Sequence, residues 1–131
     1  MDGKQETLKD IEQTLGFVPQ WLALVPDSAI EVEWGLIKGR EMAETAIPNK
    51  YKELIGLGVA AQMQCPYSVV FHTEVARLCG ATEEELEEAV GMAKLTAGWG
   101  AYFQGMQVDM EQFRREAKEV CDAIAAKQKA A

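Results

Sequence analysis

Three residues with chemically useful side chains lie close together in the stretch QCPYSVVFH, from Gln64 to His72: Cys65, Ser68 and His72, the single histidine of the chain. Proline favours the first position of a helix, so Pro66 predicts a helix that begins there with Cys65 as its N-cap. A thiol at an N-cap faces the free N–H groups and the positive end of the helix dipole. Both favour the thiolate, the reactive form of cysteine.

Helical spacing places these three side chains on one face. At about 100° per residue, position 68 lies about 60° from Cys65, and position 72 about 20° from it. His72 is one turn beyond Ser68, and an imidazole can move protons near neutral pH. The same face continues through Val75 and Cys79, so spacing alone also fits an ordinary core stripe.

The rest of the chain shows helical periodicity almost throughout and predicts one all-α domain over residues 1–131, with ends that fray. The segment from Leu54 to Met63 is apolar or small nearly all round and predicts a buried helix, whose two glycines allow close approach. Thr82 with Glu85 predicts a capping box. The glycines between Gly98 and Gly105 predict a break or kink. A last helix, capped by Asp109, carries a near-heptad apolar seam that packs on its own core or on a partner chain.

Composition excludes several functions. The 131 residues carry a formal charge of -8 and no basic stripe, so no nucleic-acid partner is expected. The longest apolar run is too short to span a bilayer, so no membrane partner is expected. Three cysteines match no disulfide scaffold, which favours a cytoplasmic location. Neither a metal nor another cofactor is expected, because ligand spacing and nucleotide fingerprints are absent.

The combination of Glu53, then Cys65-Pro66-Tyr67-Ser68, then His72 resembles the carboxymuconolactone decarboxylase-like superfamily, and more closely its alkylhydroperoxidase D (AhpD-like) branch. The resemblance extends from about Pro19 to Phe113. It implies an AhpD-like helical fold with a central antiparallel helix pair, assembled as a homo-oligomer, a trimer or hexamer. It also implies reduction of a peroxide or disulfide substrate, with an external thiol donor that restores the enzyme.

The resemblance further assigns roles to residues. Cys65 takes the place of the first thiol of a C-x-x-C pair, and Glu53, Tyr67 and His72 take those of a proton relay. Ser68 departs from the pattern, because it stands where the second cysteine is expected and cannot form a disulfide. Cys79 cannot replace it, since fourteen residues of one helix span about 21 Å. Whether Cys121 can act as the resolving thiol stays an open question, because that depends on the fold or on a neighbouring subunit.

Three hypotheses follow from this serine. In the first, Ser68 replaces a natural cysteine, and the parent protein is a thiol–disulfide oxidoreductase or peroxidase. In the second, Ser68 is natural and Cys65 acts alone, resolved by an external thiol. In the third, the site is vestigial, and the protein is an oligomeric binding or structural module or a non-redox carboxymuconolactone decarboxylase-like enzyme.

Overall fold

The computed structural model describes residues 3–131, and in this range the chain is helical with no strand. The elements are α1 (Gly3–Leu15), α2 (Gln20–Ala23), α3 (Ile30–Leu36), the π-helical turn η1 (Ile37–Glu41), α4 (Asn49–Met63), α5 (Pro66–Leu78), α6 (Glu83–Gly105) and α7 (Met110–Ala130). The all-α prediction is therefore confirmed. No helix within the described range is both long and apolar enough to cross a membrane.

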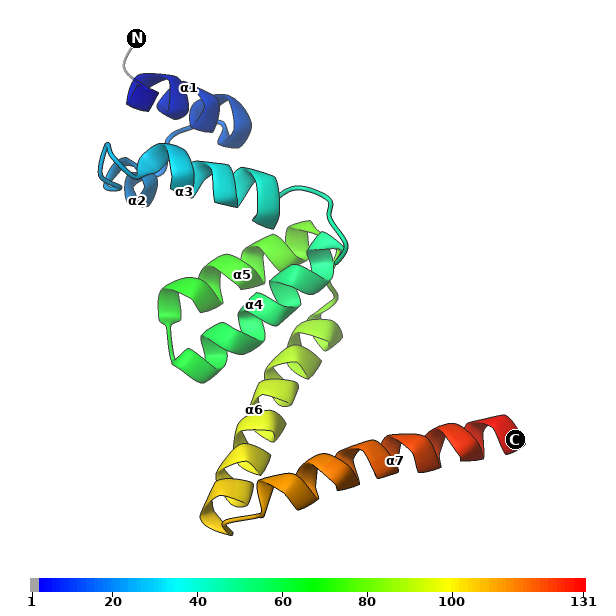
Figure 1. Ribbon diagram of the computed structural model, residues 1–131. Helices are drawn as coiled ribbons and strands as arrows, with labels where there is room; N and C mark the ends of the chain where they lie inside the picture. The colour runs from blue at the N-terminus through cyan, green and yellow to red at the C-terminus, as the bar shows by residue number, and fades with distance from the viewer. Residues whose placement is uncertain (1–2) are drawn as a thin grey trace.

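Helices α4 and α5 form the central antiparallel pair (Figure 1). Only Gln64 and Cys65 separate them. Gln64 adopts the left-handed conformation with a φ of 56°, and the Cys65 N–H donates to the Ala60 carbonyl at 3.1 Å. This arrangement of bonds ends α4 in the same way as a Schellman motif. Because Cys65 is also the N-cap of α5, the turn fixes the backbone of the cysteine at the start of the second helix.

Two hydrophobic clusters hold the helices together. The first joins α1, α2 and α3 through Ile11, Leu22, Ile30 and Trp34. The second joins α4, α5 and α6 through Leu57, Ala76 and Leu86. Burial of a leucine-sized side chain contributes on the order of 2 kcal/mol, so each cluster is a substantial part of the stability. The second cluster fixes the two helices that carry the predicted site residues.

Several local predictions are confirmed. Cys65 caps α5 with Pro66 in the first turn. Thr82 and Glu85 form the reciprocal capping box of α6. The Asp109 carboxylate accepts a hydrogen bond from the Gln112 N–H at 2.8 Å, as expected for the start of α7.

Of the two alternatives predicted between Gly98 and Gly105, a break or a kink, the break is wrong, because α6 continues through to Gly105. Glycine costs a helix about 1 kcal/mol, but aromatic side chains at helical spacing offset that cost. Trp99 stacks on Phe103 with ring centroids 5.6 Å apart, and Tyr102 meets Trp99 edge-on at 5.9 Å. Phe103 in turn contacts Phe113 of α7 at 4.9 Å.

The prediction that α4 is buried on all sides is also wrong. Glu53, Leu57 and Ala60 are buried, whereas Ile55, Val59 and Met63 are more than half exposed. The helix is covered on the sides that face α5 and α6, and its remaining apolar face is open.

Candidate active site

The site begins with a buried acid–imidazole pair between α4 and α5. The Glu53 carboxylate lies 2.7 Å from Nδ1 of His72 and is almost completely buried. A carboxylate only accepts hydrogen bonds, so Nδ1 carries the proton and Nε2 of the neutral ring remains a proton acceptor. An imidazole oriented in this way can in principle take up or pass on a proton.

Gly56 makes the position of His72 possible. It lies one turn after Glu53 on α4, and a Cβ at this position would lie 2.6 Å from the His72 ring. No side-chain carbon tolerates so short a contact. The sequence indicates a close approach through the glycines of this helix, but it does not say that the approaching group is the histidine.

The second part of the site is the thiol. The Cys65 thiol donates a hydrogen bond to Oγ of Ser68 at 3.4 Å. When the thiol ionises, the Ser68 hydroxyl becomes the donor to the sulfur. The Ser68 hydroxyl lowers the pKa of Cys65 below its ordinary value, helped by the backbone N–H groups of Ser68 and Tyr67, against a smaller opposing effect of desolvation. The serine in the second-cysteine position therefore stabilises the thiolate, although it cannot resolve a disulfide.

The five predicted site residues lie in different parts of this arrangement. Two pairs form, Glu53 with His72 and Cys65 with Ser68, and within the described residues no hydrogen bond joins one pair to the other. The Tyr67 side chain is 85% exposed, and its backbone N–H rather than its hydroxyl acts on the thiol. The resemblance assigns Tyr67 to a proton relay, but in the described chain no hydrogen bond of its hydroxyl supports that role.

Sequence reasoning missed an aromatic contact that joins α2 to the site. Phe71 meets the His72 ring edge-on at 5.5 Å and meets Trp21 edge-on at 6.0 Å. Phe71 thus packs against the imidazole, and Phe71 and Trp21 line a groove that also includes Pro66 and Ser68. Only the adjacency of Phe71 to His72 could have indicated this contact, and nothing in the sequence indicates Trp21.

The other two cysteines differ from Cys65. Cys79 caps the far end of α5, where desolvation and the negative charges of Glu53 and Glu44 raise the pKa of its thiol. Cys121 lies exposed on α7. Within residues 3–131, no group of three or more His, Cys, Asp or Glu side chains is placed to hold a metal ion.

An all-α, AhpD-like fold with a capping cysteine and a buried Glu–His pair defines the class of protein. The model of the carboxymuconolactone decarboxylase family matches residues 29–109, and the chain belongs to this family. The alkylhydroperoxidase AhpD core of Rhodospirillum rubrum is a similar solved structure, with a TM-score of 0.73 and 26% identity over 83% of this chain and 84% of that chain.

A second relative is "Uncharacterized protein 4 in cox locus" of Paracoccus denitrificans. The two sequences are 37% identical over 60 residues, which is 46% of this chain. The match spans 54% of that relative, about half of its length.

The close approach at Gly56 predicts that alanine substitutions at two glycines of α4 change the stability of the protein in opposite directions. Gly56→Ala should force the His72 ring away from Glu53 and lower the stability by about 1–3 kcal/mol through overpacking. This loss exceeds the stability that alanine adds through its higher helix propensity. Gly58→Ala is the control, because its Cβ would lie 3.5 Å from the Ala89 carbonyl oxygen, an ordinary contact distance. This variant should gain about 1 kcal/mol of stability, because alanine favours the helix more than glycine does. Urea unfolding of both variants measures the difference. Equal stability of the two variants would contradict the close approach.

The Ser68 contact predicts an order of thiol reactivity with pH. Because the pKa of Cys65 is lowered and that of Cys79 is raised, alkylation of Cys65 begins at lower pH. Ser68→Ala removes the largest cause of the shift and moves the Cys65 profile to higher pH, whereas Cys79 in the same molecule keeps its profile. Mass spectrometry of iodoacetamide-treated peptides across a pH series measures both, and an unchanged Cys65 profile would argue against the serine's role.

Proposed function

We propose that this protein is a thiol-dependent reductase in which Cys65 attacks a hydroperoxide or a disulfide. The observation that carries the proposal is the Cys65 thiol at the N-terminus of α5, with its pKa lowered mainly by the Ser68 hydroxyl. The similarity to an alkylhydroperoxidase core agrees with this chemistry. We assign the Glu53–His72 pair to proton transfer.

In the peroxide reaction, the Cys65 thiolate attacks the hydroxyl oxygen of the hydroperoxide. The O–O bond breaks, the sulfur is oxidised to the sulfenic level, and an alcohol leaves. The proton of the attacked oxygen passes to the departing alkoxide, and His72 is the group we assign to carry it, with Glu53 stabilising the charged imidazole. Because the two hydrogen-bonded pairs are not joined to each other, the substrate itself must complete the connection between them.

An external thiol then restores the enzyme. The sulfenate takes up a proton from water, and the resulting sulfenic acid condenses with this thiol, which releases water and forms a mixed disulfide with Cys65. A second thiol attacks this disulfide, so that an oxidised external disulfide leaves and the Cys65 thiolate is regenerated. With a disulfide substrate, the thiolate enters the same cycle at the mixed-disulfide stage. Because Ser68 cannot supply the second sulfur, we assign that role to an external thiol.

The proposal is tested by treating the whole protein with a limiting dose of hydroperoxide and mapping the oxidised residue by peptide mass. We expect one oxygen atom on Cys65, removed by a dithiol, while Cys79 and Cys121 in the same molecule stay reduced. Oxidation spread equally over the three cysteines would contradict a redox site. It would favour a binding or structural role.

A gain-of-function variant tests the part played by Ser68. Ser68→Cys restores the C-x-x-C spacing, so peroxide treatment should form an internal disulfide with loss of both free thiols. Turnover with a dithiol should then exceed that of the unaltered chain at least tenfold. Thiol counting and a coupled peroxide-consumption assay measure this. Failure of the two cysteines to pair would mean that the geometry at the start of α5 does not suit the family's internal cycle.

The groove beside Ser68 predicts a preference among disulfides of different charge. Glu41 and Glu74 are among its lining residues, and no lysine or arginine is. A cationic disulfide such as cystamine should therefore react with Cys65 faster than a neutral one, and oxidised glutathione more slowly than either, with differences that shrink as salt is added. Glu41→Gln should reduce the preference, whereas Glu84→Gln, at a position outside the groove, should not. Equal rates for all three disulfides would contradict this selectivity.

A further inference from the structure

The groove beside Ser68 is rich in aromatic side chains, whose rings take no part in the chemistry proposed above. It lies between α5 and the segment formed by α2 and η1, and Trp21, Tyr67 and Phe71 line it. The Trp21 and Phe71 rings are inclined at 78° to each other, so they form a corner instead of a flat wall. The volume of this α2–α5 groove is about 900 Å³. Sites for small molecules typically measure about 300–1,000 Å³, so the groove is large enough for one.

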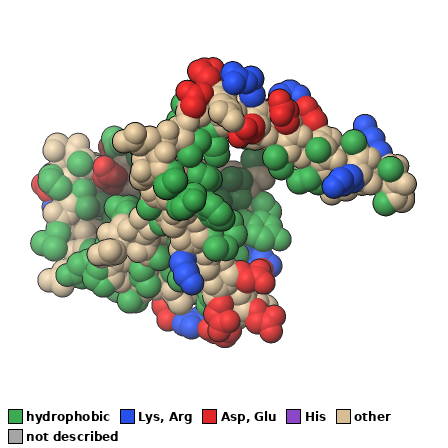
Figure 2. All heavy atoms as spheres, turned by 90° about the horizontal axis from the view of Figure 1, so that it is seen from below, with side chains coloured by type: hydrophobic (Ala, Val, Ile, Leu, Met, Phe, Trp, Pro, Cys, Tyr) green, Lys and Arg blue, Asp and Glu red, His purple; other side chains and the backbone are tan. Residues whose placement is uncertain are grey.

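One carboxylate of the α2–α5 groove has no cation beside it. Glu41 lines the groove from η1, and it forms no ion pair with any residue between positions 3 and 131. Glu74 also lines the groove, but Nη1 of Arg77 lies 3.2 Å from its carboxylate. Figure 2 shows acidic and basic side chains as neighbours along α7 too, where Glu111 pairs with Arg114. Glu41 therefore leaves an uncompensated negative charge beside the aromatic rings.

The π-helical turn η1 fixes the place of Glu41. The Met42 N–H donates to the Ile37 carbonyl, five residues back, at 2.9 Å. Such turns are rare and frequently lie at functional sites. Nζ of Lys38 binds a carboxylate of α1 at 2.7 Å, and Nζ of Lys52 on α4 donates to two carbonyls around the turn. The backbone that carries Glu41 is thus anchored to helices of both hydrophobic clusters.

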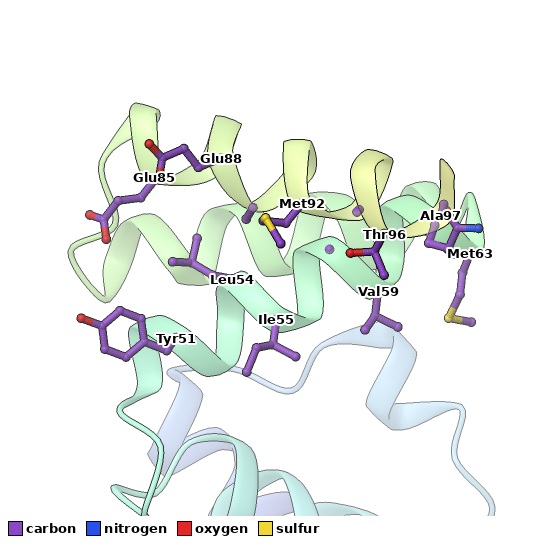
Figure 3. A pocket seen from close by; sticks show the side chains of 14 residues that line it. Tyr51, Leu54, Ile55, Val59, Met63, Glu85, Glu88, Met92, Thr96 and Ala97 are labelled. Carbon is purple, nitrogen blue, oxygen red and sulfur yellow. The ribbon is translucent and has the colours of Figure 1, made fainter. Parts of the chain in front are cut away.

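Another groove of the chain shows how a ring and a carboxylate together hold a cation. This groove lies between α4 and α6, and Figure 3 shows Tyr51 and Glu85 at one end of it. Nζ of Lys50 lies 5.2 Å from the centroid of the Tyr51 ring and 2.9 Å from the Glu85 carboxylate. A lysine of the chain thus serves both groups there. The α2–α5 groove has the rings and Glu41 but no such lysine, so a cation for them has to come from a ligand.

The lining of the α2–α5 groove favours one kind of cation. A primary ammonium has three N–H donors, and it loses hydrogen bonds to water among apolar and aromatic groups. A quaternary ammonium has no donor to satisfy, and an aromatic face attracts it within about 6 Å of the ring centroid. The positive end of the α5 dipole repels cations only within the first turn, and Phe71 lies beyond that turn. The charge is therefore expected near Phe71 and Glu41, with the rest of the ligand toward Ser68.

We propose that the α2–α5 groove is a binding site for a quaternary ammonium group, held by the Trp21 and Phe71 rings and by the Glu41 carboxylate. The binding itself does not depend on the chemistry of Cys65. One consequence does rest on the proposed function: a substrate or thiol donor that carries such a group is brought to the first turn of α5, where Cys65 and Ser68 lie.

Binding is tested with choline and the full chain by nuclear magnetic resonance of the tryptophan indole N–H groups. The chain has three tryptophans, which serve as separate reporters. Trp21 lines the groove, Trp34 belongs to the first hydrophobic cluster, and Trp99 lies on α6. We expect choline to shift the Trp21 signal to saturation while the signals of Trp34 and Trp99 stay in place. Shifts of equal size in all three signals would overturn the proposal.

Two matched compounds separate the charge of choline from its shape. In 3,3-dimethylbutanol a carbon atom replaces the charged nitrogen, and this compound should bind about tenfold more weakly than choline. Ammonium ion carries the charge without the methyl groups, and it should leave the Trp21 signal in place at the same ionic strength. Equal binding of dimethylbutanol would mean that the groove attracts any apolar group, and equal binding of ammonium that it attracts any cation. Either result would overturn the proposal.

Two pairs of variants identify the groups that hold the cation. Glu41→Gln removes the charge and keeps the size, and Trp21→Leu keeps an apolar side chain without the ring. Each should weaken choline binding about tenfold, as measured by isothermal titration calorimetry. Glu84→Gln and Trp99→Leu are the controls outside the groove and should leave the affinity unchanged. Unchanged affinity in both groove variants would contradict the site.

The outcome can be separated from that of a folding defect and from that of the proposed chemistry. Trp21 and Trp99 are both about half exposed, so neither leucine variant empties a core position, and circular dichroism checks that helicity is retained. Oxidation of Cys65 by a hydroperoxide is measured on the same preparations. A protein that does not bind choline but is still oxidised at Cys65 would refute the ammonium site and leave the proposed function standing.

Discussion

The contact between the Glu53 carboxylate and the His72 ring is the constraint on which the rest of the site depends. A carboxylate buried among apolar helices is costly unless it has a hydrogen-bond partner, and His72 supplies that partner at 2.7 Å. The ring can reach it only because α4 has no side chain at Gly56. One glycine and one hydrogen bond therefore set how closely α4 and α5 approach around the site.

The short turn between these helices then places the thiol. Gln64 and Cys65 form the whole connection, so the residue that ends one helix also caps the next. The N–H groups at the start of α5 and the Ser68 hydroxyl favour the thiolate. In the proposed reaction, the group that activates the sulfur therefore differs from the group that resolves the oxidised sulfur. Ser68 would favour the thiolate, and the resolving thiol would come from outside the C-x-x-C position.

The sequence predicted features that depend on near neighbours. The Cys65 cap, the Thr82 capping box and the Asp109 cap each rest on residues three or fewer positions apart, and the structure contains all three. The approach of Glu53 to His72 depends on how two helices fold together, and only the family resemblance indicated it beforehand. The contacts of Trp21 and Phe71 are non-local for the same reason.

The two wrong helix predictions have a common cause. Periodicity reports which residues are apolar but does not say what covers them, so the open face of α4 has the same pattern as a buried one. Likewise, the glycines after Gly98 weaken a helix locally, and the stacked rings of Trp99 and Phe103 that sustain it are visible only in three dimensions.

The central claim is that Cys65 and the Glu53–His72 pair act as one site. The most direct measurement is the rate at which a hydroperoxide oxidises Cys65 in the unaltered protein, in Glu53→Gln, in His72→Asn and in the double variant. If the residues act as one unit, each single change slows the reaction by about the same factor, at least tenfold, and the double change adds little. Rates that stay unchanged in both single variants, with Cys65 still the oxidised residue, would contradict the account.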